Sequence, residues 1–335
     1  MNGRRHRAAS VVAAGMVSCI ALSVLAATGA HAQAGRTEKF PSKPIRIIVS
    51  SAPGGGQDVT TRPVAQKLGE NLGVSVVVDN RGGGSGVIAM DITRQAAPDG
   101  HTLLVGATTM ILVSVTRRVP YDVRSAYEPV VQMTNQPYFI VVHPSIPATT
   151  PKEFVDYAKT RPGALTYGTS GSGSLHFFGV ERLSAIVGIR VVHVPYKGSG
   201  PALIDLLAGN IQFMLTSTVS AAGHLRSGKL RAVAFTGRSR TQVSPQTPTL
   251  AETVAPGYEL QNKYCVFAPA KTPRAVLALL NREIAAIVNG GEVRDKFAAD
   301  GADPAPAVSV DEFRSAYARE VTAWEKLVKT MKVEM

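Results

Sequence analysis

The segment Pro53–Asp58 carries three consecutive glycines directly after an apolar run, Ile45–Val49. A strand that ends in glycines and then enters a helix leaves several backbone N–H groups unpaired and pointing one way. Glycine permits the close approach of a ligand, and the positive end of the helix favours negative charge. The segment therefore predicts an anion site built from backbone. An ordinary strand-to-helix turn is the alternative interpretation.

The N-terminal residues have the layout of an export signal. Three arginines precede an uncharged, largely apolar stretch, residues 8–30, which closes on Ala30-His31-Ala32 and Ala32-Gln33-Ala34. Small-x-small sites of this kind are cut by signal peptidase, whereas a retained membrane anchor would not need them. We therefore expect residues 1–34 to be a signal peptide and the mature chain to be periplasmic.

The composition limits the classes of molecule that the chain is expected to bind. The net charge is +12, but the lysines and arginines are scattered and not interleaved with aromatic residues, so nucleic-acid binding is not expected. A basic surface favours anionic small molecules, although it is also compatible with simple solvation. Cys265 is the only cysteine after the signal segment, which excludes an intramolecular disulfide and a thiolate metal site.

Apolar runs alternate with amphipathic stretches along the whole mature chain, the pattern of a doubly wound α/β protein. The predicted strands are Ile45–Val49, Val74–Val78, Thr102–Val105, Leu165–Tyr167, Phe139–His143, Arg190–His193, Ile211–Leu215 and Ala232–Phe235.

Several helix starts can be predicted from capping residues in the sequence. Capping boxes stand at Thr150–Glu153, Thr249–Glu252 and Ser309–Glu312, and Thr272-Pro273 opens a further helix. The last helix carries apolar residues at near-helical spacing, which we assign to the core: Phe313, Tyr317, Trp324, Leu327 and Val328.

Pro63 conflicts with a helix that begins at Asp58. Either Asp58 caps a distorted first turn, or Thr61 is the cap and Pro63 an early helical position.

Three more donor-rich turns follow predicted strands: Asp79–Gly86, Gly106–Thr109 and Gly168–Ser174. Ligands of open α/β sheets bind outside the carboxyl ends of the strands. Hydroxyls and backbone amides gathered there would bind a carboxylate without a fixed countercharge.

Enzyme motifs are weak or missing. Gly84–Ala89 fits the dinucleotide pattern G-x-G-x-x-A, but an exported chain meets little NAD. The sequence contains no P-loop, no G-x-S-x-G elbow and no paired metal-binding histidines. We therefore predict a non-enzyme with no catalytic residue, no metal and no cofactor.

Several motifs together resemble the Bug family, the periplasmic solute receptors of tripartite tricarboxylate transporters. They run in family order from about Phe40 to the C-terminus: Pro41–Ile45, Pro53–Asp58, Asp79–Arg81, Ala97–Leu104, Ser170–His176, His193–Ala202 and Phe267–Pro273.

The resemblance implies an α/β fold of the two-lobed periplasmic binding protein type (type II), each lobe a sheet flanked by helices. It places residues 35–137 and 258–335 in lobe one and residues 138–257 in lobe two. It also implies a monomer that passes a small organic carboxylate to membrane permease subunits.

The same resemblance assigns the binding residues. One carboxylate is expected at the first glycine turn, with a second lobe-one loop and an opposing turn of lobe two completing the site. The predicted ligand-binding residues are Ser51, Gly54, Gly55, Gly56, Gln57, Asp58, Thr108, Thr109, Ser170, Gly171, Gly173, Ser174 and Thr216.

Three positions depart from the family pattern. Ser51 replaces a usual bulky aromatic, Gln57 a threonine, and Thr216-Ser217 a common Asp-Asn. Loss of that acid removes a partner for an amine, so we expect a di- or tricarboxylate or an aromatic carboxylate. A sensor that docks onto a kinase, and an exported nucleotide-dependent enzyme, are the alternative functions.

Overall fold

One long strand, β4 (Tyr127–Val142), joins two groups of strands in the computed structural model, which describes residues 40–116 and 119–330. Up to Pro137, β4 pairs antiparallel with β9 (Gln261–Pro269). From Tyr138 onward it pairs with β7 (Phe213–Ser217) and β8 (Arg231–Phe235). The change of partners divides the strands into two half-sheets.

The first half-sheet has the order β2-β1-β3-β9-β4. β1 (Ile45–Val49) lies parallel to β2 (Val76–Asn80) and β3 (Thr102–Ala107), and β3 is antiparallel to β9. The short β10 (Asp303–Pro304) pairs with β4. Flanking helices are α2 (Gly56–Leu72), α3 (Val87–Arg94), α4 (Thr108–Thr116), α5 (Val123–Ala126), α10 (Arg274–Asn289), α11 (Gly291–Ala299) and α12 (Val310–Thr330).

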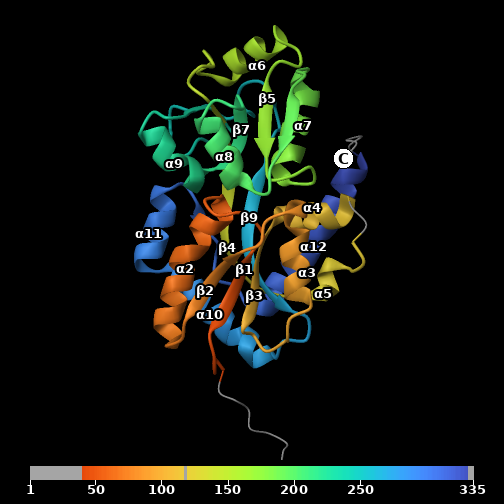
Figure 1. Ribbon diagram of the computed structural model, residues 1–335, viewed down its shortest axis with the longest axis vertical. Coiled ribbons are helices and arrows are strands. Elements are labelled where there is room, and N and C mark those ends of the chain that lie inside the picture. The colour runs from red at the N-terminus through yellow and green to blue at the C-terminus, as the bar shows by residue number, and fades with distance from the viewer. Residues whose placement is uncertain (1–39, 117–118, 331–335) are drawn as a thin grey trace, which may run out of the picture. The chain divides into compact units, whose positions relative to one another are not determined.

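The second half-sheet continues the order as β4-β7-β5-β6, with β8 on β4. β5 (Thr166–Thr169) lies parallel to β6 (Val192–Pro195) and to β7. Its helices are α6 (Pro151–Lys159), α7 (Leu175–Val187), α8 (Ser199–Leu207) and α9 (Thr218–Arg226). Figure 1 shows these green elements together, with β4 and β9 running between them and the red, orange and blue elements.

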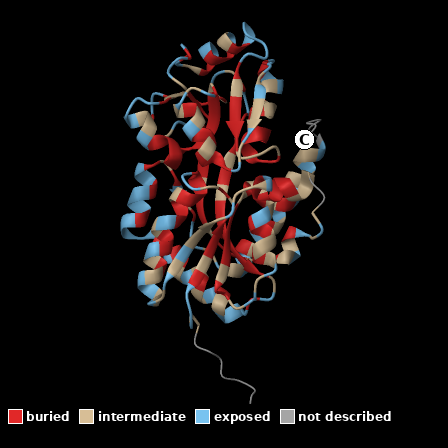
Figure 2. Cartoon of the chain, in the orientation of Figure 1, coloured by how far each residue is buried: buried red, intermediate tan, exposed pale blue. Residues whose placement is uncertain are grey.

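The core follows the strands, as the red central ribbons of Figure 2 show. β1 alone buries Ile45, Ile47, Ile48 and Val49 almost completely. Fully burying an aliphatic side chain stabilises the fold by about 1.5–3 kcal/mol. The described residues from Lys43 onward form one compact unit.

α12 connects the apolar clusters of the two half-sheets. Phe313 and Tyr317 are buried beside Phe267, in the cluster of the first half-sheet. Farther along, Trp324 packs edge-on against Phe178 of α7, with ring centroids 5.3 Å apart. The core role predicted for the aromatics of this helix is confirmed.

Most predicted strands appear with small shifts. Residues 76–80 form β2 instead of Val74–Val78, because Asp79 and Asn80 pair with Ile48 and Val49 of β1. Asp79 tolerates this partly buried place because Arg46 and Arg81 bind its carboxylate. The first part of β4 and the whole of β9 were not predicted, since neither has a clean apolar–polar alternation.

The predicted helix at Thr249–Glu252 is wrong. Thr249 Oγ1 accepts from the Glu252 amide at 3.1 Å, as in a capping box, but only turns follow. The Leu250 carbonyl accepts from the Ala255 amide (2.9 Å), which closes a wide turn, and Pro256-Gly257 blocks further helical turns. The boxes at Thr150 and Ser309 do start helices.

Both predicted starts of α2 are also wrong. The helix begins at Gly56, with Gly55 as its N-cap, and Pro63 lies inside it. Asp58 occupies the first turn and reaches back to accept from the Gly54 amide at 3.0 Å. An acid in the first turn stabilises this end of the helix without being its cap.

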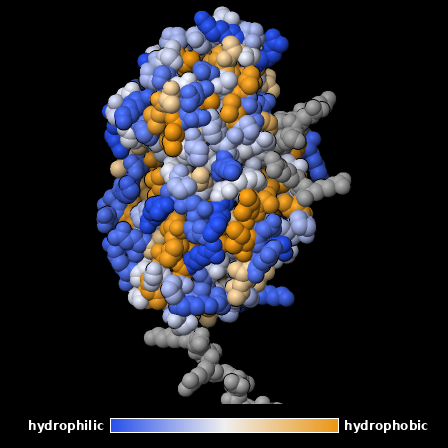
Figure 3. Space-filling model, viewed as in Figure 1, coloured by the Kyte–Doolittle hydropathy of each residue, from blue (hydrophilic) through white to orange (hydrophobic). Residues whose placement is uncertain are grey.

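The surface carries scattered apolar side chains, the most exposed being Ile204 (67%) and Val77 (51%). The view in Figure 3 shows hydrophobic residues in separate small patches. Within residues 40–116 and 119–330, no helix combines the length and the apolarity needed to cross a bilayer. The same residues contain no group of three or more potential metal ligands. The predicted signal peptide, residues 1–34, lies outside the described part.

Candidate functional site

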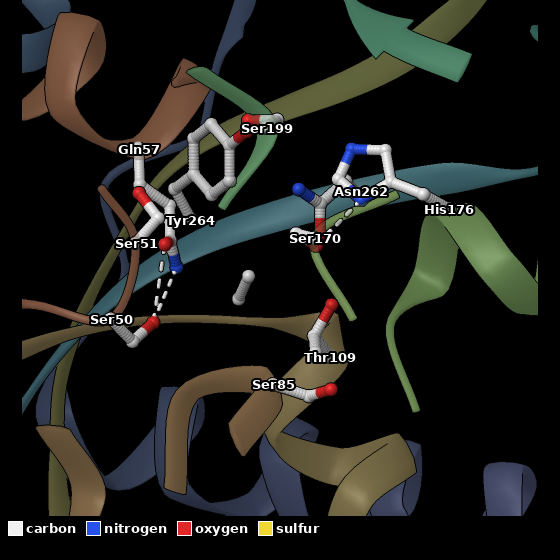
Figure 4. Close-up of a pocket in the computed structure, with 11 residues that line it drawn as sticks. Ser50, Ser51, Gln57, Ser85, Thr109, Ser170, His176, Ser199, Asn262 and Tyr264 are labelled. Atoms are coloured by element: carbon white, nitrogen blue, oxygen red, sulfur yellow. Dashed lines mark hydrogen bonds between the residues drawn. The ribbon is translucent and has the colours of Figure 1, made fainter. Parts of the chain in front are cut away.

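A cavity of about 30 Å³ lies at the carboxyl ends of β1 and β3, between the starts of α2 and α7. The free space holds little more than water, so a larger ligand must displace side chains or move the facing turns apart. Figure 4 shows the lining side chains in two groups that face each other. They are Ser50, Ser51, Gln57, Ser85, Ala107, Thr109, Ser170, His176, Ser199, Asn262 and Tyr264.

On the α2 side, hydroxyls and an amide meet at the predicted glycine turn. Gln57 Nε2 donates to Ser50 Oγ at 2.8 Å, and the Ser50 hydroxyl lies 3.1 Å from Gln57 Oε1. Ser51 is buried beside them and lines the same wall. This wall therefore consists of short neutral groups around the uncapped start of α2.

The acid of this turn faces away from the cavity. Asp58 Oδ2 accepts from the Gly54 amide and from Arg62 Nε (3.1 Å). Burial would raise the pKa of Asp58, but the hydrogen bonds from Arg62, Gly54 and Asn80 together lower it. The carboxylate is thus ionised at neutral pH and holds the glycine turn in place.

On the α7 side, Ser174 caps the helix by accepting from the Phe177 amide at 3.2 Å. The cap orients the first turn so that His176 reaches the cavity, where its Nδ1 lies 2.9 Å from Ser170 Oγ. The ring packs at a tilt against Tyr138, with centroids 4.9 Å apart. Thr109 of α4 touches the same turn, because its Oγ1 accepts from the Leu175 amide (3.1 Å).

β9 forms the floor between the two groups. Asn262 accepts from the Thr108 amide through Oδ1 (3.2 Å), and Thr108 Oγ1 accepts from the Lys263 amide (3.1 Å). Tyr264 reaches the start of α2, where its hydroxyl occupies the space that a side chain at Gly56 would need. Burial raises the pKa of Tyr264 to about 12, so it stays a hydrogen-bond donor at neutral pH.

The two half-sheets touch through glycines. A Cβ at Gly200, at the start of α8, would lie 2.0 Å from the Pro53 carbonyl oxygen. A Cβ at Gly56 would lie 2.4 Å from Ser217 Oγ. Side chains at these positions would force the starts of α2, α8 and α9 apart, so glycine is required for their close approach.

The cavity wall is neutral at neutral pH. Its residues include no acid, lysine or arginine. Burial lowers the pKa of His176 to about 4, which keeps the imidazole uncharged. Such a site binds an anion through hydroxyl and amide donors, and it offers no carboxylate to pair with an amine.

The structure brings four of the predicted site residues to the cavity wall: Ser51, Gln57, Thr109 and Ser170. The others lie around the wall. Gly54, Gly55, Gly56 and Asp58 build the α2 turn, Gly171, Gly173 and Ser174 build the α7 turn, Thr108 binds β9, and Thr216 is buried in β7 opposite Phe139. Their part in binding stays a prediction.

Seven lining residues were missed. Ser85 and Ser199 lie in glycine-rich motifs that were noticed, and Ser50 adjoins one, but none was assigned to the site. Asn262 and Tyr264 come from β9, which was not predicted. His176 was named only as the last residue of the Ser170–His176 motif, with no role assigned to it. Only its position two residues after a capping serine indicated that it would sit at a helix start. The seventh is Ala107.

Comparison with known proteins gives consistent matches. The family model "Tripartite tricarboxylate transporter family receptor" matches residues 60–333. Protein BugT of Bordetella pertussis is 33% identical over 311 residues, covering 92% of this chain and 95% of BugT. Two solved structures from Rhodopseudomonas palustris also match closely.

Rpa4515 with adipate has a TM-score of 0.82 at 31% identity, over 87% of this chain and 98% of that one. MatC with bound malate has a TM-score of 0.81 at 28% identity, over 86% and 100%. The expected fold, a two-lobed α/β periplasmic binding protein, is confirmed by these neighbours.

Proposed function

Because this chain belongs to the tripartite tricarboxylate transporter receptor family, we propose that it captures a small organic carboxylate in the periplasm and delivers it to the membrane subunits of such a transporter. The resemblance to the Bug family is confirmed. This is a family of solute receptors and not of enzymes.

The neutral, donor-rich cavity is the observation that carries the carboxylate proposal. It presents hydroxyls, amides and an uncharged imidazole, and no acid that would repel an anion. The start of α2 adds the positive end of a helix on which no side chain of the described residues provides a cap. The related structures with adipate and malate support the same ligand class.

Delivery requires two conformations, and the strand pairing suggests where they differ. We take residues 35–137 and 258–335 as lobe one and residues 138–257 as lobe two. Supporting this division, β4 changes partners between Pro137 and Tyr138. A ligand between the lobes favours the closed form by its differential affinity for that form. We infer that the permease subunits recognise the closed monomer.

Trp324 provides a direct binding assay, because it is the only tryptophan of the chain. It packs on Phe178 of α7, the helix whose first turn lines the cavity. Movement of α7 relative to α12 should change its emission. Titration of the mature chain with malate, succinate, adipate, citrate and benzoate should give a saturable fluorescence change for at least one of them.

A thermal-shift screen with the same compounds gives an independent readout. A ligand at 100 times its dissociation constant adds about 2.7 kcal/mol to the stability of the folded protein. The proposal fails if no carboxylate changes either signal while putrescine or NAD does. A response to NAD would instead support the nucleotide-dependent enzyme.

A further inference from the structure

His176 occupies the α7 side of the cavity, opposite the start of α2 (Figure 4). The ring is held from two directions: Ser170 lies 2.9 Å from Nδ1, and the tilted Tyr138 ring packs against it. Only 7% of the residue is exposed. The imidazole is therefore fixed in orientation before any ligand arrives, as a recognition group must be.

The other ring nitrogen, Nε2, has no hydrogen-bond partner among the described residues. The residue is nine-tenths buried, so this nitrogen depends on the cavity for a hydrogen-bond partner. His193, in the same half-sheet, serves as a comparison because its ring lies elsewhere. Its Nε2 lies 2.6 Å from Thr169 Oγ1, and its ring packs between Tyr167 and Phe177, outside the cavity wall.

No charged side chain competes for this nitrogen. The titratable groups around the ring are Tyr138, from β4, and Tyr264, from β9, and burial raises the pKa of both. α4 and β7, which pack against α7, contribute no acid and no base. On α7 itself, Glu181 binds the Tyr167 hydroxyl and Arg182 the Glu259 carbonyl.

We propose that His176 is a specificity-determining residue whose Nε2 binds a second carboxylate, at the end of the ligand away from α2. The inference rests on the proposed function and assigns the ligand class as a short dicarboxylate. With Ser170 donating to Nδ1, the ring proton sits on Nε2 and is donated to the ligand.

The rest of the wall favours the same class. Ala107 is its only aliphatic side chain, and Thr109 and Ser85 lie beside the α7 turn. Both hydroxyl oxygens already accept from backbone amides, so a hydrocarbon end or an aromatic ring would leave their hydroxyl hydrogens without an acceptor, which costs affinity. A carboxylate end satisfies them.

Succinate and butyrate test the proposal, because they share a four-carbon chain and differ in the second carboxylate. Calorimetric titration of the wild-type protein should give at least about tenfold tighter binding of succinate. His176→Phe keeps the packing against Tyr138 but removes the nitrogen. It should weaken succinate at least about tenfold and leave butyrate within about threefold.

Two further variants control the result. His193→Phe replaces a comparably packed ring outside the cavity and should change neither affinity. His176→Gln places an amide near the position of Nε2 and should restore part of the succinate affinity. If circular dichroism and thermal unfolding show that His176→Phe does not fold, the succinate affinity of His176→Gln tests the role of Nε2 instead.

The pH dependence of succinate binding distinguishes a His176 that binds the ligand from one that only packs in the fold. A carboxylate against Nε2 raises the pKa of the imidazole in the complex, so succinate binding takes up a proton. The ratio of wild-type to His176→Phe affinity for succinate should therefore rise from pH 7 to pH 5.5, because the protonation of succinate itself and of the other histidines is common to both proteins. Butyrate should show no such difference between the two proteins.

The outcomes separate the two proposals. If neither compound nor any other carboxylate binds, the receptor function fails. If carboxylates bind but His176→Phe weakens succinate and butyrate equally, or neither of them, the role of His176 is overturned while the receptor function stands.

Discussion

α2 and α7 meet the cavity from opposite half-sheets, but they begin in different ways. α2 starts after Gly55 with no side-chain cap, and Asp58 holds the preceding turn through the Gly54 amide. α7 starts after Ser174, which caps it, and the nearby amides of Gly173 and Leu175 donate to the hydroxyls of Ser85 and Thr109. We infer that α2 offers backbone donors to a ligand, whereas α7 offers the side chains of Ser170 and His176. Common and selective recognition would then lie on different helices.

The largest effect is expected from Gly200→Ala, because the new methyl group would displace the backbone of the turn that precedes α2. The added Cβ would lie 2.0 Å from the Pro53 carbonyl oxygen and 3.1 Å from the Gly55 nitrogen. We expect carboxylate affinity to fall at least about 100-fold, measured by Trp324 fluorescence, with the fold retained.

Gly223→Ala, in α9, is the matched control. A Cβ there meets nothing within 4 Å, so the variant should bind normally and gain about 0.5–1 kcal/mol of stability. Normal binding by Gly200→Ala would show that the contact between α2 and α8 is not part of the ligand-bound form.

Asp58→Asn tests how the α2 turn is held. The folded pKa of Asp58 is lowered, so its carboxylate stabilises the fold above the ordinary pKa near 4, and this contribution is lost as the pH falls through the folded value. In urea unfolding at pH 7 the variant should lose about 1–2 kcal/mol.

The stability difference from wild type should shrink at pH 3. A difference that is independent of pH would mean that the amide replaces the carboxylate and that charge plays no part in holding the turn.

Ser174→Ala tests whether the cap of α7 positions His176 for ligand binding. Loss of the cap should cost about 1 kcal/mol of unfolding free energy. Because the cap positions His176, succinate affinity should also fall about threefold to tenfold. Ser309→Ala removes the comparable cap of α12 and should cost similar stability without affecting affinity. Equal affinities in the two variants would refute the positioning role of the Ser174 cap.

The smallest effect is expected from Thr216→Val. Thr216 is 1% exposed, and its Oγ1 has no partner among the described residues. Replacing it with an apolar isostere should leave stability unchanged or raise it by up to about 1 kcal/mol. Because Thr216 does not line the cavity, titration with a carboxylate should give wild-type affinity. A large loss of affinity would show that Thr216 does take part in binding, as the sequence predicted.

Local patterns predicted local structure well. The apolar run of β1, the glycine turn after it and the capping boxes at Thr150 and Ser309 all depend on neighbours in the sequence. Thr249–Glu252 shows the limit: the box formed, but Pro256-Gly257 follows closely and only turns result. A capping box starts a helix only where the residues after it can continue the helix.

The site was predicted in part for the same reason. Glycine- and serine-rich turns indicated that these segments face a ligand, since backbone geometry requires those residue types, but the residue at which α2 begins was not predicted. Tyr264, Asn262 and His176 reach the cavity only because β9 and α7 pack as they do. A single tyrosine or histidine in the sequence carries no sign of such a neighbourhood.

The position of Trp324 also affects how the molecule is made. Trp324, Leu327 and Val328 pack against a cluster whose other members lie at positions 112–260. Those three residues leave the ribosome after the rest of that cluster. This apolar surface therefore stays uncovered until the last part of the chain has been made. Final packing of the two half-sheets has to wait for α12, and a product shortened before position 324 would leave an apolar surface exposed.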